Sequence, residues 1–132
     1  MSNNRSWIFS AALMAIAVSM PGAALAADPV KVGYLIPLSG SAAASIGQEM
    51  SRATHLAVKH INEAGGIKSM GGAQLQLVEV DTRGDPKVGI TEAERLITVE
   101  KVPVLIGAFQ SNVTFPATAA AQAAAPGTEK IG

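Results

Sequence analysis

Residues whose side chains could perform covalent or metal chemistry are few in this sequence of 132 residues. There is no cysteine, which excludes a disulfide framework, a thiolate zinc site and a cysteine nucleophile. The two histidines, His55 and His60, are five positions apart. This spacing is roughly 140° around a helix of about 3.6 residues per turn, so the two rings face different directions. We therefore predict surface histidines and no metal site.

Two carboxylates, Asp81 and Asp85, lie close enough in the sequence to be considered as an acid–base pair. Their neighbours Gly84 and Pro86 favour instead a turn and a helix N-cap, where Asp side chains accept hydrogen bonds from backbone N–H groups. No G-x-G-x-x-G motif follows the predicted first strand, and no G-x-S-x-G motif is present. The sequence therefore predicts no enzyme, no catalytic residue and no cofactor.

The first 26 residues have the composition of a secretory signal peptide. Their single charge, Arg5, precedes an apolar run from Trp7 to Met20, the helix breaker Pro21-Gly22 and the small residues Ala24-Leu25-Ala26. The apolar run is shorter than the roughly 20 residues that span a bilayer. We therefore predict cleavage after Ala26, no stable membrane insertion after cleavage, and a mature protein in the periplasm.

The charge balance excludes another class of partner. Ten basic and ten acidic residues give a formal net charge of zero, which provides no bulk attraction for nucleic acid. Without Arg5, the mature chain has nine basic and ten acidic residues, an ordinary composition for a soluble domain.

The mature chain alternates strand and helix patterns. Runs of β-favouring residues predict strands at Val30–Ile36, Leu75–Val80 and Val102–Ile106. The third run is apolar on both faces, which is typical of a strand covered by helices above and below. Apolar residues at helical spacing predict helices from about Ser45 to Ile61, from Pro86 to about Glu100 and from Pro116 to Ala125, with a loop over Phe109–Phe115.

The helix patterns also predict caps and buried faces. Ser45 and Gln48 have the spacing of a capping box, and Gly65-Gly66 is expected to end the first helix. The predicted inward face of the first helix comprises Met50, Ala53, Ala57, Val58 and Ile61, and that of the second comprises Ile90, Ala93, Leu96 and Ile97.

The resulting order is βαβαβα, and right-handed crossovers would place all three strands parallel in one sheet. Three strands and three helices leave sheet edges and apolar faces without partners, so we expect an incomplete domain. The last residues, Thr128–Gly132, lie where a fourth strand would be expected to begin.

Three segments together resemble the periplasmic solute-binding proteins of branched-chain amino acid (Leu/Ile/Val-binding type) ABC transporters. The segments are Lys31-Val32-Gly33-Tyr34-Leu35-Ile36-Pro37-Leu38-Ser39-Gly40, Ile61-Asn62-Glu63-Ala64-Gly65-Gly66-Ile67 and Asp81-Thr82-Arg83-Gly84-Asp85-Pro86-Lys87. Each segment alone is a weak signal, whereas their order behind a signal peptide is fairly specific. The resemblance extends from about Val30 to Ala125.

The resemblance implies an α/β fold with a type I periplasmic-binding-protein-like parallel sheet. Residues 27–132 would then form the N-terminal part of lobe 1 of a two-lobed protein that closes on a small ligand and delivers it to a membrane permease. In an open parallel sheet, ligands lie beyond the carboxyl ends of the strands, where the direction of winding switches. With strand order 2-1-3, this point lies between the loops after Ile36 and Ile106.

The resemblance also implies three ligand-contacting residues. Ser111 follows Gly107-Ala108-Phe109-Gln110, which looks like the family loop where a serine hydroxyl and backbone N–H groups hold the ligand carboxylate. Unpaired N–H groups and a helix dipole favour an anion at such a place. Ser111 and Gln110 could instead have structural roles in the turn. Ile46 falls near a family position that often carries an aromatic residue over the ligand, although the loop before it is one residue longer here.

We therefore expect the solute-binding component of an ABC uptake system, most simply for a branched-chain or other aliphatic amino acid. Two alternatives remain open. One is a ligand-sensing receptor domain on the same fold, and the other is a truncated product without independent binding function. Neighbouring genes would distinguish the uptake component from the sensor domain, because a permease gene accompanies an importer and a kinase or regulator gene accompanies a sensor.

Overall fold

The computed structural model describes residues 27–125 of the chain. The predicted signal peptide and the segment from Thr128 to Gly132 lie outside the described residues. The elements are β1 (Val30–Ile36), α1 (Ala44–Glu63), the short 3-10 helix η1 (Lys68–Met70), β2 (Leu75–Asp81), α2 (Pro86–Thr98), β3 (Val104–Ile106) and α3 (Ser111–Ala124). The predicted βαβαβα order is confirmed.

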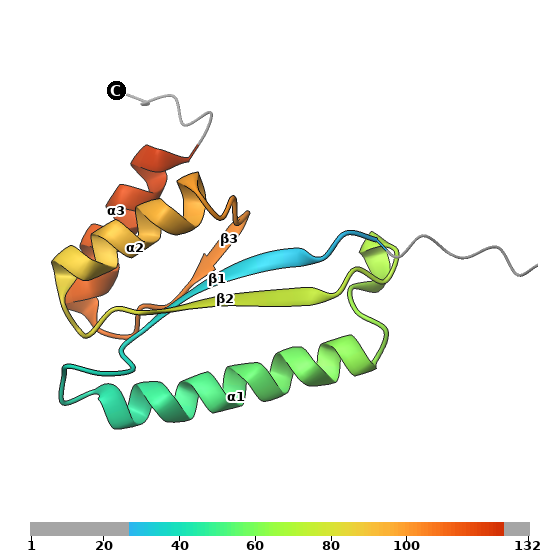
Figure 1. Ribbon diagram of the computed structural model, residues 1–132, viewed down its shortest axis with the longest axis horizontal. Coiled ribbons are helices and arrows are strands. Elements are labelled where there is room, and N and C mark those ends of the chain that lie inside the picture. The colour runs from blue at the N-terminus through green and yellow to red at the C-terminus, as the bar shows by residue number, and fades with distance from the viewer. Residues whose placement is uncertain (1–26, 126–132) are drawn as a thin grey trace, which may run out of the picture.

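The three strands form one parallel sheet in the order β2-β1-β3. Val30 to Ile36 of β1 pair in register with Leu75 to Asp81 of β2, and Val32 to Tyr34 pair with Val104 to Ile106 of β3. In Figure 1, α1 lies along one face of the sheet, and α2 and α3 lie together on the other. The predicted strand order 2-1-3 is therefore confirmed, and all three strands end at the same edge of the sheet.

The hydrophobic core lies between the sheet and the pair α2 and α3. It contains the buried residues Leu35, Val80, Ala93, Leu96, Val102, Ala108, Val113 and Ala117. Two glycines allow close approach within it. A Cβ on Gly33 would lie 2.5 Å from Leu105 Cδ2, and a Cβ on Gly89 would lie 2.5 Å from Val113 Cγ1. Gly89 is therefore the point where α2 and α3 pack against each other.

The predicted inward face of α1 is wrong in three positions. Met50 and Val58 are partly buried, but Ala53, Ala57 and Ile61 are exposed. The residues turned inward instead follow Gly47 at helical spacing, and they are Ser51, Thr54, Val58 and Asn62.

Contacts at both ends of α1 explain this rotation. Gly47 is buried against the Pro37 carbonyl, where a Cβ would lie only 1.8 Å from the oxygen. The Asn62 amide donates to Leu75 O at 2.9 Å and accepts from Leu75 N at 2.8 Å. These contacts favour small and polar residues on the inward face of α1, which a search for apolar periodicity does not find.

The start of α1 also differs from the prediction. The N-cap residue is Ala43, and no side chain caps the helix, so the predicted Ser45–Gln48 capping box is absent. Gln48 Nε2 instead donates to Leu38 O at 3.0 Å, which holds the preceding loop. The helix ends before Gly65 and Gly66, both with positive φ, as predicted.

Helix α3 begins five residues earlier than expected, so the predicted loop over Phe109–Phe115 is confirmed at Phe109 and Gln110 and wrong from Ser111 onward. The carbonyl of Gln110 accepts hydrogen bonds from Val113 N, Thr114 N and Thr114 Oγ1, which establishes a first turn from Ser111. Pro116 lies inside the helix. The prediction placed Pro116 at the first helical position because proline is common there.

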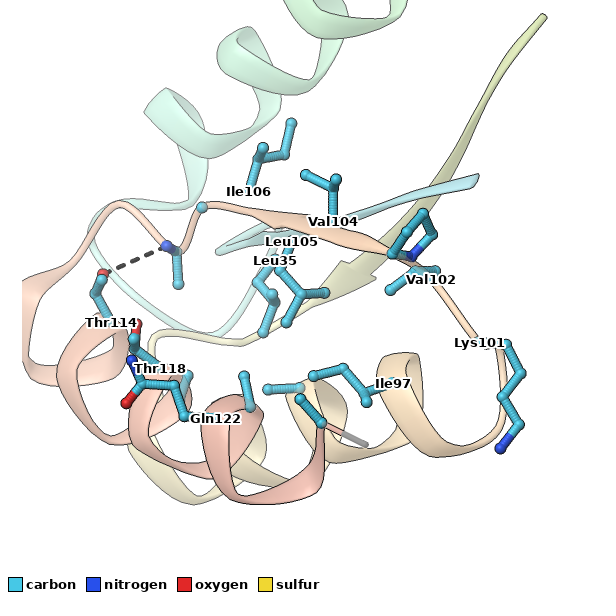
Figure 2. A pocket seen from close by; sticks show the side chains of 17 residues that line it. Leu35, Ile97, Lys101, Val102, Val104, Leu105, Ile106, Thr114, Thr118 and Gln122 are labelled. Carbon is cyan, nitrogen blue, oxygen red and sulfur yellow. Dashed lines mark hydrogen bonds between the residues drawn. The ribbon is translucent and has the colours of Figure 1, made fainter. Parts of the chain in front are cut away.

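The third strand is covered on one face only, in contrast to the prediction of a strand with helices above and below. The β3 residues Val104 and Ile106 are 48% and 39% exposed. Figure 2 shows these two side chains on one side of β3, with Leu105 on the opposite side toward α2 and α3. None of the helices between residues 27 and 125 has the length and apolar character needed to cross a bilayer.

Candidate ligand-binding site

Three loops meet at the carboxyl edge of the sheet: the β1–α1 loop (residues 37–43), the β2–α2 loop (residues 82–85) and the β3–α3 loop (residues 107–110). Asp81, the last residue of β2, joins the first two. Its carboxylate accepts hydrogen bonds from Leu38 N at 2.8 Å, Ser39 N at 3.3 Å, Ser39 Oγ at 2.5 Å and Arg83 N at 2.8 Å. One carboxylate thus fixes the start of the β1–α1 loop and its own turn.

The Asp81 carboxyl group is ionised at neutral pH. Partial burial raises its pKa, but the hydrogen bonds from Ser39 Oγ and from the N–H groups of Arg83, Leu38 and Ser39 together lower the pKa below its ordinary value. These donors satisfy the carboxylate internally. Asp81 therefore organises the loops, as the predicted turn role implies, and Asp85 caps α2 by accepting from Lys87 N and Val88 N, as predicted.

Gly84 lies where the β2–α2 loop contacts both neighbouring loops. A Cβ at this position would lie 2.7 Å from Gln110 Oε1, 2.7 Å from Ser41 Cβ and 2.9 Å from Ser41 Oγ. Sequence reasoning missed Ser41 and gave Gly84 only a turn role. The positive φ of +67° fits the turn prediction, but only the strand order brings Ser41 and Gln110 against this glycine.

Ser111 is the first residue of α3, and its side chain is exposed. Within residues 27–125, its hydroxyl makes no hydrogen bond, and the backbone N–H groups of Ser111 and Asn112 have no acceptor. A helix N-terminus with free N–H groups carries partial positive charge and suits an anion. The structure therefore presents a hydroxyl and two N–H donors together at the carboxyl edge of the sheet.

The other two predicted contact residues are near the same edge but differ in exposure. Gln110 is the N-cap residue of α3, and its Oε1 atom is buried beside Gly84. Ile46 lies in the first turn of α1 and is 49% exposed. In Figure 1 the first turns of α1 and α3 lie at the same end of the sheet. That Gln110 and Ile46 contact a ligand stays a prediction.

A separate apolar cavity of about 620 Å³ lies beside β3. Its walls are β3 with Leu35 on one side and α2 and α3 on the other, as Figure 2 shows. Thr114 lies at one end, where Ala108 N donates to its Oγ1 at 3.3 Å. Neither Ser111, Gln110 nor Ile46 lines this cavity.

The histidines lie away from the three loops. Both are exposed, and His55 Nε2 is 3.6 Å from Glu79 Oε2 across α1 and β2. In the part of the chain that the structure describes, no group of three His, Cys, Asp or Glu side chains could hold a metal ion. The polar groups at the carboxyl edge of the sheet suit hydrogen bonding to an anionic ligand.

Comparisons with known proteins agree with this arrangement. The Leu/Ile/Val-binding protein homolog 7 of Brucella melitensis is 39% identical over 98 residues, which cover 74% of this chain and 23% of that relative. The Leu/Ile/Val-binding protein homolog 1 of Brucella abortus is 34% identical over 114 residues, or 86% of this chain and 29% of the relative. The chain thus spans about a quarter of the length of these curated relatives.

Solved structures of transporter binding proteins are also similar to this chain. A branched-chain amino acid transporter substrate binding protein from Streptococcus pneumoniae, in complex with isoleucine, superposes with a TM-score of 0.68 and 31% identity, over 74% of this chain and 27% of that one. An ABC transporter solute binding protein from R. palustris, in complex with benzoate, has a TM-score of 0.61 and 30% identity, over 72% of this chain and 25% of that one. The predicted type I sheet is confirmed.

A family match completes the comparison. Residues 29–125, which include all three strands and all three α-helices, match the family described as periplasmic binding protein. The match covers the loops that form the carboxyl edge of the sheet. The chain belongs to the periplasmic binding protein family.

Proposed function

We propose that this chain supplies part of the first lobe of the solute-binding component of an ABC uptake system, for a branched-chain or other aliphatic amino acid. The resemblance to proteins named for leucine, isoleucine and valine binding supports this ligand class. Export by the predicted signal peptide to the periplasm, and delivery of the ligand to a membrane permease, belong to the same proposal. The function is capture and release of a ligand, without covalent chemistry.

The observation that carries the proposal is the first turn of α3. The Ser111 hydroxyl and the N–H groups of Ser111 and Asn112, which have no partner within residues 27–125, lie next to one another at the carboxyl edge of the sheet. A carboxylate can accept from all three donors, and the helix dipole adds to the attraction. We propose that Ser111 binds the ligand carboxylate, with Gln110 and Ile46 beside it at the edge of the site.

The test is isothermal titration calorimetry with L-isoleucine on the protein purified from the periplasm of its host, with and without the substitution Ser111→Ala. We expect Ser111→Ala to weaken binding by about tenfold, because one hydrogen bond to a charged group is lost. Ser69→Ala is the matched control, because Ser69 is an exposed serine in the 3-10 helix η1.

Two further ligands make the result specific. L-isoleucinol has the same side chain and ammonium group but no carboxylate, so we expect it to bind weakly to the native protein and equally weakly to Ser111→Ala. Benzoate tests whether a carboxylate with an aromatic ring is preferred. Equal L-isoleucine affinities for the native protein and Ser111→Ala would refute the role of Ser111.

A further inference from the structure

Two polar atoms at the carboxyl edge of the sheet are buried without a hydrogen-bond partner in the described part of the chain. They are Oγ of Ser41, in the β1–α1 loop, and Oε1 of Gln110, in the β3–α3 loop. Buried polar atoms without partners are rare in native proteins, because they lose their hydrogen bonds to water and gain none in return. Their presence together indicates a role that packing alone does not explain.

The two atoms approach the same point from different loops. That point is the position of a Cβ on Gly84, which would lie 2.7 Å from Gln110 Oε1 and 2.9 Å from Ser41 Oγ. Glycine has a hydrogen atom there, so both oxygens can approach the backbone of residue 84 closely. Any other residue would displace one side chain or the other.

Each of the two side chains is attached to a segment that is held in place. The start of the β1–α1 loop is bonded to Asp81 through Leu38 N and Ser39, only two residues before Ser41. The Gln110 carbonyl accepts from Val113 N and Thr114 N in the first turn of α3. A connection between the Ser41 and Gln110 side chains would therefore link the β1–α1 loop to the first turn of α3.

We propose that Ser41 and Gln110, packed on Gly84, form a polar junction that positions the first turn of α3 and with it Ser111. Oε1 of an amide can only accept, so the Ser41 hydroxyl is the donor of any hydrogen bond across the junction. No such bond is formed in the conformation described, where the contacts of both side chains with Gly84 join the loops. Ser41 and Gln110 are positioning residues, and this inference rests on the proposed function of Ser111.

A double-mutant cycle on L-isoleucine affinity tests the junction in the protein purified from the periplasm. We expect Ser41→Ala and Gln110→Ala each to weaken binding by about fivefold, and the double variant to be no weaker than the worse single variant, because the two side chains act as one unit. Ser41→Thr keeps the hydroxyl and is expected to keep the affinity. Additive losses, or a loss for Gln110→Ala with none for Ser41→Ala, would overturn the junction.

Gly84→Ala tests the position between the two oxygens, and the chain offers a matched control. Gly71 has the same φ of +67°, but the nearest atom to its Cβ position is Ala27 Cβ at 3.8 Å. Gly71→Ala therefore measures the backbone cost of alanine at this φ alone. We expect Gly84→Ala to weaken L-isoleucine binding by about tenfold and Gly71→Ala to leave it unchanged, because a small displacement of binding groups costs much affinity. Equal affinities of the two variants would contradict the junction.

Nuclear magnetic resonance without ligand separates this inference from the proposed function. We expect Gly84→Ala, and not Gly71→Ala, to shift the amide resonances of Ser111 and Asn112. If the native protein shows no L-isoleucine binding, the proposed function fails for that ligand. The amide resonances still test the junction in that case. If Gly84→Ala leaves the amide resonances of Ser111 and Asn112 unchanged, the junction is overturned, whatever the ligand.

Discussion

Asp81 shows how much one side chain can contribute to the geometry of a binding edge. It accepts hydrogen bonds from the β1–α1 loop and from the turn that leads to Gly84, so it holds the loops that carry Ser41 and Gly84. A carboxylate has enough lone pairs for these donors, whereas an amide oxygen has fewer and its nitrogen would meet N–H groups. The charge state of Asp81 should therefore affect loop order.

We predict that Asp81→Asn lowers the free energy of unfolding by about 1 kcal/mol at neutral pH, since the group is partly exposed and its hydrogen bonds are weakened by solvent. The folded-state pKa of Asp81 lies below the unfolded value of about 3.9, so its stabilisation is fully present above that value and disappears as the pH falls through the folded-state pKa. Urea unfolding at pH 7 and pH 3 measures the difference.

The expected result is a difference in the free energy of unfolding between the native protein and Asp81→Asn that is larger at pH 7 than at pH 3. Asp28→Asn provides the control, because Asp28 is exposed near the start of the described residues. If this difference in the free energy of unfolding is the same at both pH values, the charge of Asp81 does not help to hold the loops.

Among the elements, the contact between α2 and α3 depends on Gly89. A glycine within a helix usually costs up to about 1 kcal/mol of stability relative to alanine, and the sequence alone indicates only this cost. In the fold, a Cβ on Gly89 would lie 2.5 Å from Cγ1 of Val113, which is completely buried. The β-branched valine has few rotamers with which to avoid the clash.

We therefore predict that Gly89→Ala destabilises the protein by about 1–3 kcal/mol despite its better helix propensity. In the double variant Gly89→Ala/Val113→Ala, the clash is absent, and Gly89→Ala should become neutral or stabilising relative to Val113→Ala alone. Thermal or urea unfolding of the four proteins measures the coupling. An additive double variant would show that contact with Val113 does not determine the effect of Gly89→Ala.

The elements that could be predicted from the sequence are those with simple local signals. The strand from Val30 to Ile36 is a continuous β-favouring run ended by Pro37, and the N-cap of α2 is marked by Asp85 before Pro86. Predictions failed where distant contacts decide. The inward face of α1 depends on Gly47 against Pro37 and on Asn62 bonded to β2, and such contacts have no local signature.

At the candidate site, too, some features could be predicted from the sequence and others could not. The loop that contains Ser111 could be indicated from a family resemblance, and its place beyond β3 follows from the strand order. The start of α3 could not be predicted from the sequence, because the hydrogen bonds of Thr114 with Gln110 and Ala108 depend on how the preceding loop turns. The contact of Ser41 with Gly84 joins loops 43 residues apart in the sequence, so it exists only once the sheet has formed.

Considered as a whole molecule, the described residues leave apolar surface exposed on the side of the sheet that carries α1. Val104 and Ile106 on β3 are 48% and 39% exposed there, and Phe115 in α3, which lies on the other side of the sheet, is 77% exposed. Exposed apolar surface on a strand at the edge of a sheet promotes association. Leu105, on the opposite face of β3, packs against the core, so the two faces of one short strand have different roles.

We predict that residues 27–132, expressed alone, bind a hydrophobic dye and associate, and that Val104→Ser/Ile106→Ser reduces both effects with little loss of stability. The reason is that these two side chains are 48% and 39% exposed and lie outside the hydrophobic core. Leu105→Ala is the contrasting variant, because Leu105 packs against the core beside Gly33, and its truncation should cost about 2 kcal/mol without reducing association. Sedimentation velocity and dye fluorescence provide the measurements, and association that persists in the double serine variant would place the self-association surface elsewhere.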